Sequence, residues 1–454
     1  MERDAIDLGR LNIPTLFRRF FIPTLLGMLS ISAVTAIDGI FVGHGVGSDG
    51  IAAINLVVPL WMVFTGLGLM MGVGCSVVAS LHLAKGKIKA ARINVTQALS
   101  FVTLVTVLAS AAVIAFPEES ARFLGSSERL LPWVKDYLAW IVPCLVFQMW
   151  GAIALFIIRL DGSPRLAMWC TVLAGAINVV LDWVFIFPLG WGVKGAAIAT
   201  SISIVVEGII VFAYLWKYAR ILQLYRLKWS RKSLRLSLRN IGYQCRIGSS
   251  ALLGELTLAV LVFIGNQVFG SYLGDDGIGA FGIACYYTPF VFMVGNAIAQ
   301  SAQPIISYNF GIARFERVAQ TERIALSTAV ACSALVMSAF VLFPESLVEL
   351  FAQTDSRAAQ IAIDGLPYFS WGFVFFVLNL TAIGYYQSIE RIAPATVFAI
   401  LRGFVLLTAA FLIAPRYLGT AGIWLAMPFS EGATTLAILF YYRYQRTKAV
   451  KVLK

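Results

Sequence analysis

Residues 176–200 read AINVVLDWVFIFPLGWGVKGAAIAT, an almost wholly apolar run that contains one carboxylate, Asp182. The run joins two apolar stretches across a turn-forming segment that contains Pro188 and two glycines. A carboxylate at the centre of a membrane-spanning helix costs roughly 2.5–3.5 kcal/mol on insertion scales, so such a group is a functional candidate by default. The pattern therefore predicts a polar site inside a bundle of membrane helices.

The composition agrees with a membrane protein. The chain has 454 residues, of which 59% are hydrophobic and 13% charged, whereas a soluble protein carries about 25% charged residues. The start of the chain, MERDAIDLGRLNIP, contains acids and no compact apolar core, so we expect no removable signal peptide. The six cysteines are scattered singly, which fits neither a disulfide framework nor a metal site. The sequence contains no P-loop and no clustered His/Asp or Ser/His set, so we expect neither an ATP motor nor an enzyme.

A membrane span needs about 20 mostly apolar residues. Twelve stretches qualify: 16–41, 52–81, 92–116, 131–158, 166–188, 194–216, 246–273, 280–308, 323–343, 361–388, 393–415 and 419–442. With twelve spans, every loop rich in Lys and Arg falls on the side of the two termini, which the positive-inside rule places in the cytoplasm. The same distribution accounts for the net charge of +12 without a nucleic-acid partner. We expect a monomeric, multi-pass protein of the plasma (inner) membrane, embedded in the lipid bilayer.

Three motifs recur further along the chain, in the same order and at one constant offset. DGIAA at 49–53 returns as DGIGA at 276–280, and FPE at 116–118 returns as FPE at 343–345. Pro188, Gly192, Gly195 and Ala199 return as Pro415, Gly419, Gly422 and Ala426. Such repeats predict an all-α protein of two six-helix lobes related by a pseudo-twofold axis along the membrane normal, an architecture of transporters. The predicted lobes are 1–216 and 246–454, joined by a basic cytoplasmic linker, 217–245, whose cations lie on anionic headgroups.

Four oxygen-bearing side chains of the first lobe are predicted at comparable depth. Asp182 lies about 9 Å below the outer end of its span, and Asn178 lies one turn deeper on the same helix face. Thr200 lies about 10 Å deep in the next span, and Asp38 lies near the outer end of the first span. If they cluster, these oxygens can hold a proton or a hard cation such as sodium. No other metal site is indicated.

The second lobe offers further candidates. Glu255 is either a coupling or substrate-binding group or a buried acid with satisfied hydrogen bonds. Arg402 and Glu431 have opposite charges at matching depth, so we predict a structural ion pair. Glu207, in the first lobe, has no partner that the sequence identifies. Additional candidates for a substrate site or second coupling site are Gln300, Gln303, Tyr286 and Trp371.

These residues resemble a known family. AIDGIFVGHGVGSDGIAAI at 36–54, NVVLDWVFIFPLGWGVKGAAIAT at 178–200 and GNAIAQSAQPIISYNFG at 295–311 are similar to motifs of multidrug and toxic compound extrusion (MATE) transporters. The resemblance implies two lobes around a V-shaped cavity, and alternating access that exports organic, often cationic, compounds in exchange for protons or sodium ions. It also implies that Asp38, Asn178, Asp182 and Thr200 form the cation site. Some members use acids in the seventh and tenth spans; here Glu255 matches the first, but the tenth span has only Asp364, at its outer edge.

The function predicted from the sequence is therefore a secondary antiporter that exports small organic cations. Its preferred coupling ion is the proton, with sodium as the alternative, and no cofactor is expected. A rival interpretation is a flippase for a lipid-linked precursor, which predicts a long basic groove rather than a compact acidic site. A passive channel would conduct downhill without responding to an ion gradient.

Overall fold

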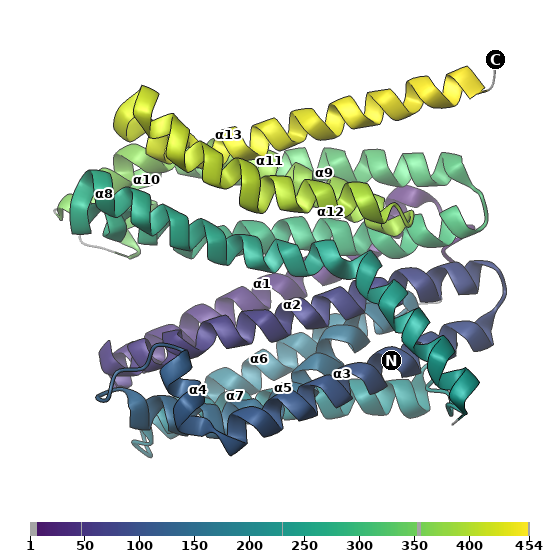
Figure 1. The fold of residues 1–454 in the computed structure, drawn as a ribbon, viewed down its shortest axis with the longest axis horizontal. Coiled ribbons are helices and arrows are strands. Elements are labelled where there is room, and N and C mark those ends of the chain that lie inside the picture. Colours follow the sequence, from purple (N-terminus) through teal and green to yellow (C-terminus); the bar gives the residue numbers. More distant parts are fainter. Residues whose placement is uncertain (1–6, 47, 229, 352–355, 453–454) are drawn as a thin grey trace. The chain divides into compact units, whose positions relative to one another are not determined.

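The computed structural model describes the whole chain except residues 1–6, 47, 229, 352–355 and 453–454. Within the described ranges the elements are helices, with no strand (Figure 1). The first seven are α1 (Ile13–Gly45), α2 (Ser48–Ala84), α3 (Ile88–Ala115), α4 (Pro117–Phe123), α5 (Leu131–Leu160), α6 (Pro164–Ile186) and α7 (Gly192–Ala213), followed by a π-helical turn, η1 (Tyr214–Tyr218). The others are α8 (Arg231–Gly311), α9 (Phe315–Leu342), α10 (Pro344–Glu349), α11 (Arg357–Ser388), α12 (Ile392–Ile400), η2 (Leu401–Val405) and α13 (Leu406–Val452).

Eleven helical segments of the described residues are long and apolar enough to cross a membrane. The last of them, Ile392–Gln445, has 54 residues and would measure about 81 Å if straight, against a hydrocarbon core of about 30 Å. It breaks at Gly419, where φ is 58° and ψ is −136°. This one segment therefore contains both the eleventh and the twelfth predicted spans, and the helical membrane architecture predicted from the sequence is confirmed.

The internal duplication is visible in the backbone. Gly192 and Gly419, which occupy equivalent positions of the two repeats, have φ values of 57° and 58°. This left-handed region is open to glycine without steric cost. At both positions the chain turns between two spans. The break between α3 and α4 is repeated as well, because Phe116 and Phe343 leave the helix with φ of −128° and −133° directly before a proline that starts a short helix.

By compactness the chain divides into two units: Met1–Glu255 with Pro304–Val318, and Leu256–Gln303 with Ala319–Lys454. In the first unit α5 packs against α2, α3 and α7, and α1 packs against α6. About half of the α5 side chains are buried, so this helix is the centre of the unit. In the second unit α11 packs against α12 and α13.

Helix α8 begins earlier than the predicted seventh span. The prediction started that span at residue 246, because the preceding residues carry too many charges for a hydropathy pattern. In the structure the helix begins at Arg231, where the Ser230 side chain accepts a hydrogen bond of 3.1 Å from the backbone N–H of Ser233. Serine is a preferred N-cap because it satisfies one of the free N–H groups of the first turn. Helix propensity and capping, rather than hydropathy, set this boundary.

Close contact with α2 fixes the first part of α8 within the first unit. A Cβ atom added at Gly74 would lie 2.0 Å from the carbonyl oxygen of Gln244, and one added at Gly248 would lie 1.8 Å from that of Met70. Both distances are far below van der Waals contact. The backbones of α2 and α8 can therefore approach this closely only because Gly74 and Gly248 have no side chain. Small residues at four-residue spacing allow this approach between membrane helices.

The connection between η1 and α8, residues 219–228, has no helix but is held to the end of α5 by one carboxylate. Asp161 accepts hydrogen bonds from the Tyr214 hydroxyl (2.9 Å) and from the backbone N–H groups of Arg220, Ile221 and Leu222 (2.8, 2.8 and 3.0 Å). The Leu222 side chain is fully buried. We call residues 219–228 the anchored connection. Thr96 also accepts a hydrogen bond from the Tyr225 N–H, and Arg92 donates one to the Ile221 carbonyl, so most of its recorded backbone hydrogen bonds are made to side chains.

Candidate functional site

Asp182 lies on α6 with its side chain fully buried. Within the described part of the chain, neither of its carboxylate oxygens meets the geometry of a hydrogen bond. Asn178, one turn earlier on the same helix, is also buried and is a neighbour of the carboxylate. Its amide donates a hydrogen bond of 3.3 Å to the Thr200 hydroxyl of α7. The structure thus brings together three of the four predicted coupling residues.

Asp38, the fourth, comes from α1, which packs along α6. Its carboxyl group faces that of Asp182 closely enough for the two to interact directly. The Oδ1 atom of Asp38 is buried and, among the described residues, has no hydrogen-bond partner. The two carboxyl groups therefore lie side by side, with the Asn178 amide as a neighbouring donor and each other as partners. Two adjacent buried acids without an opposite charge need an explanation.

Tyr137 of α5 is a fifth member that sequence reasoning missed. Its side chain is buried, and it lies close enough to both Asp38 and Asp182 to interact electrostatically with each. Tyr137 is six residues from the start of α5, so it lies about 9 Å from that helix end. This depth matches that of Asp182 below Pro188. The depth comparison could have found Tyr137 if it had included neutral hydroxyl groups as well as charged ones.

The polar groups recorded around the two carboxyl groups are the Asn178 amide, with Thr200 hydrogen-bonded to it, and the Tyr137 hydroxyl. Such a donor set suits a proton or a hard monovalent cation and gives no reason to bind a soft metal. No group of three or more His, Cys, Asp or Glu side chains arranged for a metal ion occurs among the described residues. Two buried negative charges side by side cost several kcal/mol each unless a positive charge compensates them. The arrangement can therefore take up and release one positive charge.

Glu207 of α7 has a partner that the sequence did not reveal. The Thr171 hydroxyl of α6 donates a hydrogen bond of 3.4 Å to Glu207 Oε1. Its carboxylate faces Gly151 of α5, where a Cβ atom would lie 3.7 Å from Oε2. Glu207 is seven residues beyond Thr200, which is two helix turns or about 10 Å along α7. It is therefore a separate acid of the first unit and not a member of the Asp38–Asp182 group.

In the second unit Arg402 and Glu431 form an ion pair. The guanidinium donates to the Glu431 carboxylate at 2.8 Å from Nη2 and 3.0 Å from Nε, and both side chains are almost completely buried. Asn379 of α11 donates to the other carboxylate oxygen at 2.7 Å. The Arg402 guanidinium also lies 4.3 Å from the centre of the Phe376 ring. Sequence reasoning paired the two charges but missed Asn379 and Phe376.

The remaining predicted residues are divided between the two units. Glu255 is buried in the first unit beside Gly66 of α2. Gln300 and Gln303 are buried on α8 within the second unit. Tyr286 and Trp371 are exposed side chains of the second unit, and Tyr286 stacks on Phe351 with 5.1 Å between ring centres.

An all-helical protein with many membrane spans, an internal duplication and a buried acidic pair has the architecture of a membrane transporter. A protein-family model, MatE, matches residues 23–184 and 251–411, which together make up more than two thirds of the chain. The chain belongs to the MatE family. The two matched segments start at 23 and 251 and end at 184 and 411, so the family model itself matches twice at nearly the offset of the repeated motifs.

The curated relatives are transporters rather than enzymes. The multidrug export protein MepA of Staphylococcus haemolyticus is 25% identical over 430 residues, which cover 93% of this chain and 92% of that protein. A FAD transporter of Shewanella oneidensis is 25% identical over 444 residues, covering 94% and 93%. Like them, this chain is a membrane transporter and not an enzyme.

Solved structures show the same fold. An outward-facing multidrug resistance MATE family transporter of the MOP superfamily superposes with a TM-score of 0.90 at 22% identity, and each chain is covered to 99%. A mutant of the Vibrio cholerae MATE transporter VcmN gives a TM-score of 0.87 at 19% identity, with 96% and 97% covered. Both comparisons support the fold and leave the substrate open.

Proposed function

We propose that this protein is a secondary antiporter that exports organic cations, including drugs, across the inner membrane in exchange for protons. Sodium is the alternative coupling ion. The observation that carries the proposal is the buried pair of carboxyl groups, Asp38 and Asp182, which face each other and form no ion pair with any described residue. A structural pair of acids would be surrounded by donors, as Glu431 is in the second unit.

The pair works as a charge-dependent switch. When both groups are ionised, their repulsion and the desolvation of two anions disfavour the packing of α1 against α6. One proton shared by the two carboxyl groups, or one bound sodium ion, removes that penalty. A ligand shifts a conformational equilibrium only by its different affinity for the two states. A cation bound from outside would therefore favour the state that releases the drug outward, and drug binding from the cytoplasm would favour the reverse.

Coupling is assigned to the first lobe because the duplication has not kept these side chains in the second. At the offset of the repeated motifs, the positions equivalent to Asp38, Asn178, Asp182 and Thr200 are occupied, in that order, by Gly265, Val405, Ala409 and Met427. None of these four can bind a cation through its side chain. We infer that the first lobe holds the coupling site formed by Asp38 and Asp182, and that transport exchanges one coupling charge there for each cycle; Glu255 stays a candidate for a second coupling group.

Organic cations are the proposed substrates because the buried site of this chain is acidic and several relatives are named for multidrug export. The relatives named for multidrug export and for FAD transport are equally identical to this chain, so overall identity does not separate a cationic from an anionic substrate. The test must therefore include both. A cationic dye and a flavin nucleotide, loaded separately into the same vesicles, make this comparison direct.

The experiment is gradient-driven transport in reconstituted vesicles. Wild type, Asp38→Asn and Asp182→Asn would be compared under a proton gradient and then under a sodium gradient. Asp364→Asn serves as the matched control, since it makes the same chemical change at an exposed carboxylate of α11. We expect gradient-driven dye export by wild type and control and at least a tenfold loss in both site variants. Equal export by Asp182→Asn and wild type would refute the mechanism, and export of flavin but no dye would refute the substrate class.

A further inference from the structure

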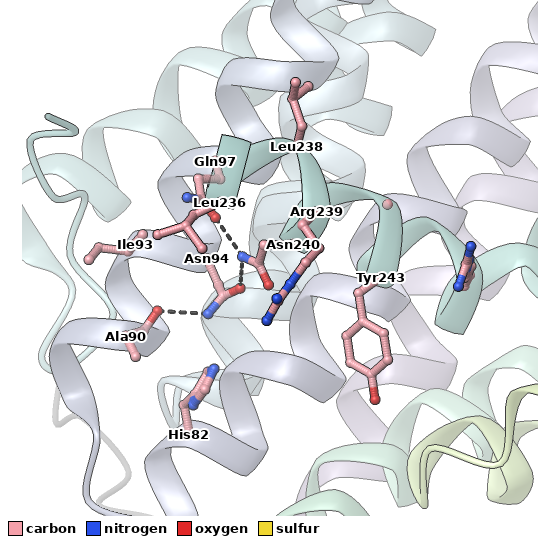
Figure 2. A pocket seen from close by; sticks show the side chains of 12 residues that line it. His82, Ala90, Ile93, Asn94, Gln97, Leu236, Leu238, Arg239, Asn240 and Tyr243 are labelled. Atoms are coloured by element: carbon pink, nitrogen blue, oxygen red, sulfur yellow. Dashed lines mark hydrogen bonds between the residues drawn. The ribbon is translucent and has the colours of Figure 1, made fainter. Parts of the chain in front are cut away.

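A pocket outside the coupling site lies in the first unit, where the ends of α2 and α3 meet the first turns of α8 (Figure 2). Its volume is about 870 Å³, and the residues that matter for its chemistry are His82, Asn94, Gln97, Arg239, Asn240 and Arg246. In Figure 2 the side chains of Arg239 and His82 extend from different helices towards the same space. The pocket is on the side of the basic loops, which the positive-inside rule assigns to the cytoplasm.

A network of amides builds the wall of this pocket. The Asn240 amide of α8 donates to the side-chain oxygens of Asn94 and Gln97 on α3. Gln244, one turn further along α8, donates to Asn94 Oδ1 at 3.1 Å, and Gln97 donates to the Ser237 hydroxyl at 2.8 Å. Asn94, Gln97 and Gln244 are buried. A network with this many partners holds the start of α8 in one position on α3.

The open side of the pocket is positively charged. Arg239 and Arg246 are seven residues apart, so both lie on one face of α8 two turns from each other. Both are exposed, and neither guanidinium group forms an ion pair or hydrogen bond within the described part of the chain. The described residues that line the pocket include no carboxylate. Residues 217–254 contain nine Lys and Arg and no Asp or Glu, so an anion is the ligand that this charge favours.

Exposed leucines lie beside these arginines. Leu234, Leu236 and Leu238 are 60%, 51% and 59% exposed, and Leu236 and Leu238 line the pocket. Large apolar side chains gathered next to arginines on one short helical stretch are typical of helices at the membrane surface, where the apolar groups enter the acyl region and the cations stay at the headgroups. The ligand therefore needs an anionic head and an apolar body.

We propose that this pocket binds the phosphate headgroup of an anionic phospholipid from the leaflet on the basic side. The guanidinium groups of Arg239 and Arg246 hold the phosphate, because a planar fork of N–H donors matches its oxygens. The acyl chains run over Leu236 and Leu238. A soluble phosphate ester shares the headgroup chemistry but would leave the leucines exposed, so the lipid is the occupant that accounts for both features.

The test compares two double variants that remove the same charge. Arg239→Gln with Arg246→Gln removes the pocket cations, and Arg231→Gln with Lys232→Gln removes two cations from the same helix outside the pocket. Native mass spectrometry of the purified full-length protein would count bound phosphatidylglycerol and phosphatidylcholine. Because the two guanidinium groups donate charge-assisted hydrogen bonds to the phosphate, we expect retention of phosphatidylglycerol to fall at least tenfold in the first double variant and to stay unchanged in the second. An equal fall in lipid retention in both double variants would show that the lipid is attracted to the basic surface in general, and it would overturn the proposed lipid site.

Two further arms complete the design. Hydrogen–deuterium exchange on the unmodified protein should slow at residues 90–97 and 237–246 with phosphatidylglycerol and not with phosphatidylcholine, a readout that does not depend on how well a variant folds. Protection at neither segment would overturn the proposal. Inorganic phosphate and glycerol 1-phosphate test the soluble source. If either protects these segments as well as the lipid does at equal concentration, the site binds soluble phosphate and the lipid assignment is wrong.

Discussion

The buried ion pair of the second unit makes a sharp prediction about stability. Arg402→Met leaves the Glu431 carboxylate with the Asn379 amide as its one remaining donor among the described residues, and it also removes the cation above Phe376. Breaking a buried pair by removing one partner costs about 3–5 kcal/mol, because a buried charge is left uncompensated. Glu431→Leu should cost a similar amount, since Arg402 is 1% exposed and then lacks an anion.

The double variant, Arg402→Met with Glu431→Leu, should be more stable than either single variant. The backbone of the two residues keeps its partners, because Asn379 also donates to the Glu431 carbonyl at 2.9 Å and the Ser430 hydroxyl donates to the Arg402 carbonyl at 3.1 Å. Replacing a whole buried pair with apolar residues of similar volume is often neutral or stabilising. The coupling between the two sites should therefore be about as large as the loss from one single variant.

The assay is the fraction of protein that stays monodisperse after heating, read by fluorescence-detected size-exclusion chromatography in one detergent. Arg122→Gln is the control, since its ion pairs with Glu118 at 3.0 Å and Glu128 at 2.8 Å join side chains that are about half exposed or more, and exposed pairs contribute little. We expect no shift for the control, a large loss for each single variant, and recovery in the double variant. Losses that simply add in the double variant would refute the pairing as the source of stability.

Three other predictions follow from the same structure. Tyr137→Phe should lower gradient-driven export severalfold while leaving heat stability unchanged, because it removes one hydroxyl beside two carboxyl groups and no packing volume; unchanged export would exclude Tyr137 from the coupling site. Gly74→Ala should destabilise the first unit by about 1–3 kcal/mol, because the added methyl group overpacks the contact with α8. The same heating assay measures this loss. Gly282→Ala is the control and should be tolerated, since no atom lies within 4 Å of its added Cβ. Asp161→Asn should expose the anchored connection and speed tryptic cleavage there about tenfold or more, since three backbone N–H groups lose a charged acceptor; an unchanged cleavage rate would show that other contacts hold it.

The sequence predicted the charged residues of the site better than the neutral ones, for a physical reason. Asp38 and Asp182 stand out because ionisable side chains are costly within membrane spans, and helix geometry then selects Asn178 and Thr200 at the same depth. Tyr137 and Asn379 carry no charge, and tyrosines and asparagines in spans have many roles. Only the folded structure, which brings Tyr137 close to Asp38 and Asp182 and places α11 beside α13, shows what these side chains touch.

The architecture was predictable where it depended on hydropathy and repetition. The constant offset read from three short motifs also relates the two left-handed glycines, Gly192 and Gly419, and it closely matches the spacing of the two family-model segments. The early start of α8 was not predictable from hydropathy, because residues 231–245 combine arginines with leucines. A serine cap at 230 was the available signal, and it marks helix start without regard to the membrane.

The two lobes have kept the same backbone turns while their buried charges have taken opposite forms. In the second unit each oxygen of Glu431 receives a hydrogen bond, so its charge is fixed by Arg402 and Asn379 and cannot change without loss of stability. In the first unit the two carboxyl groups lie close together and form no ion pair with a described residue, so two negative charges there are unfavourable unless a proton or cation is present. The duplication produced two lobes with equivalent backbone turns. The buried acids of the two lobes differ in whether a cation lies beside them. An acid paired with a cation stabilises the fold, whereas two adjacent acids without a cation have the charge that the proposed coupling mechanism requires.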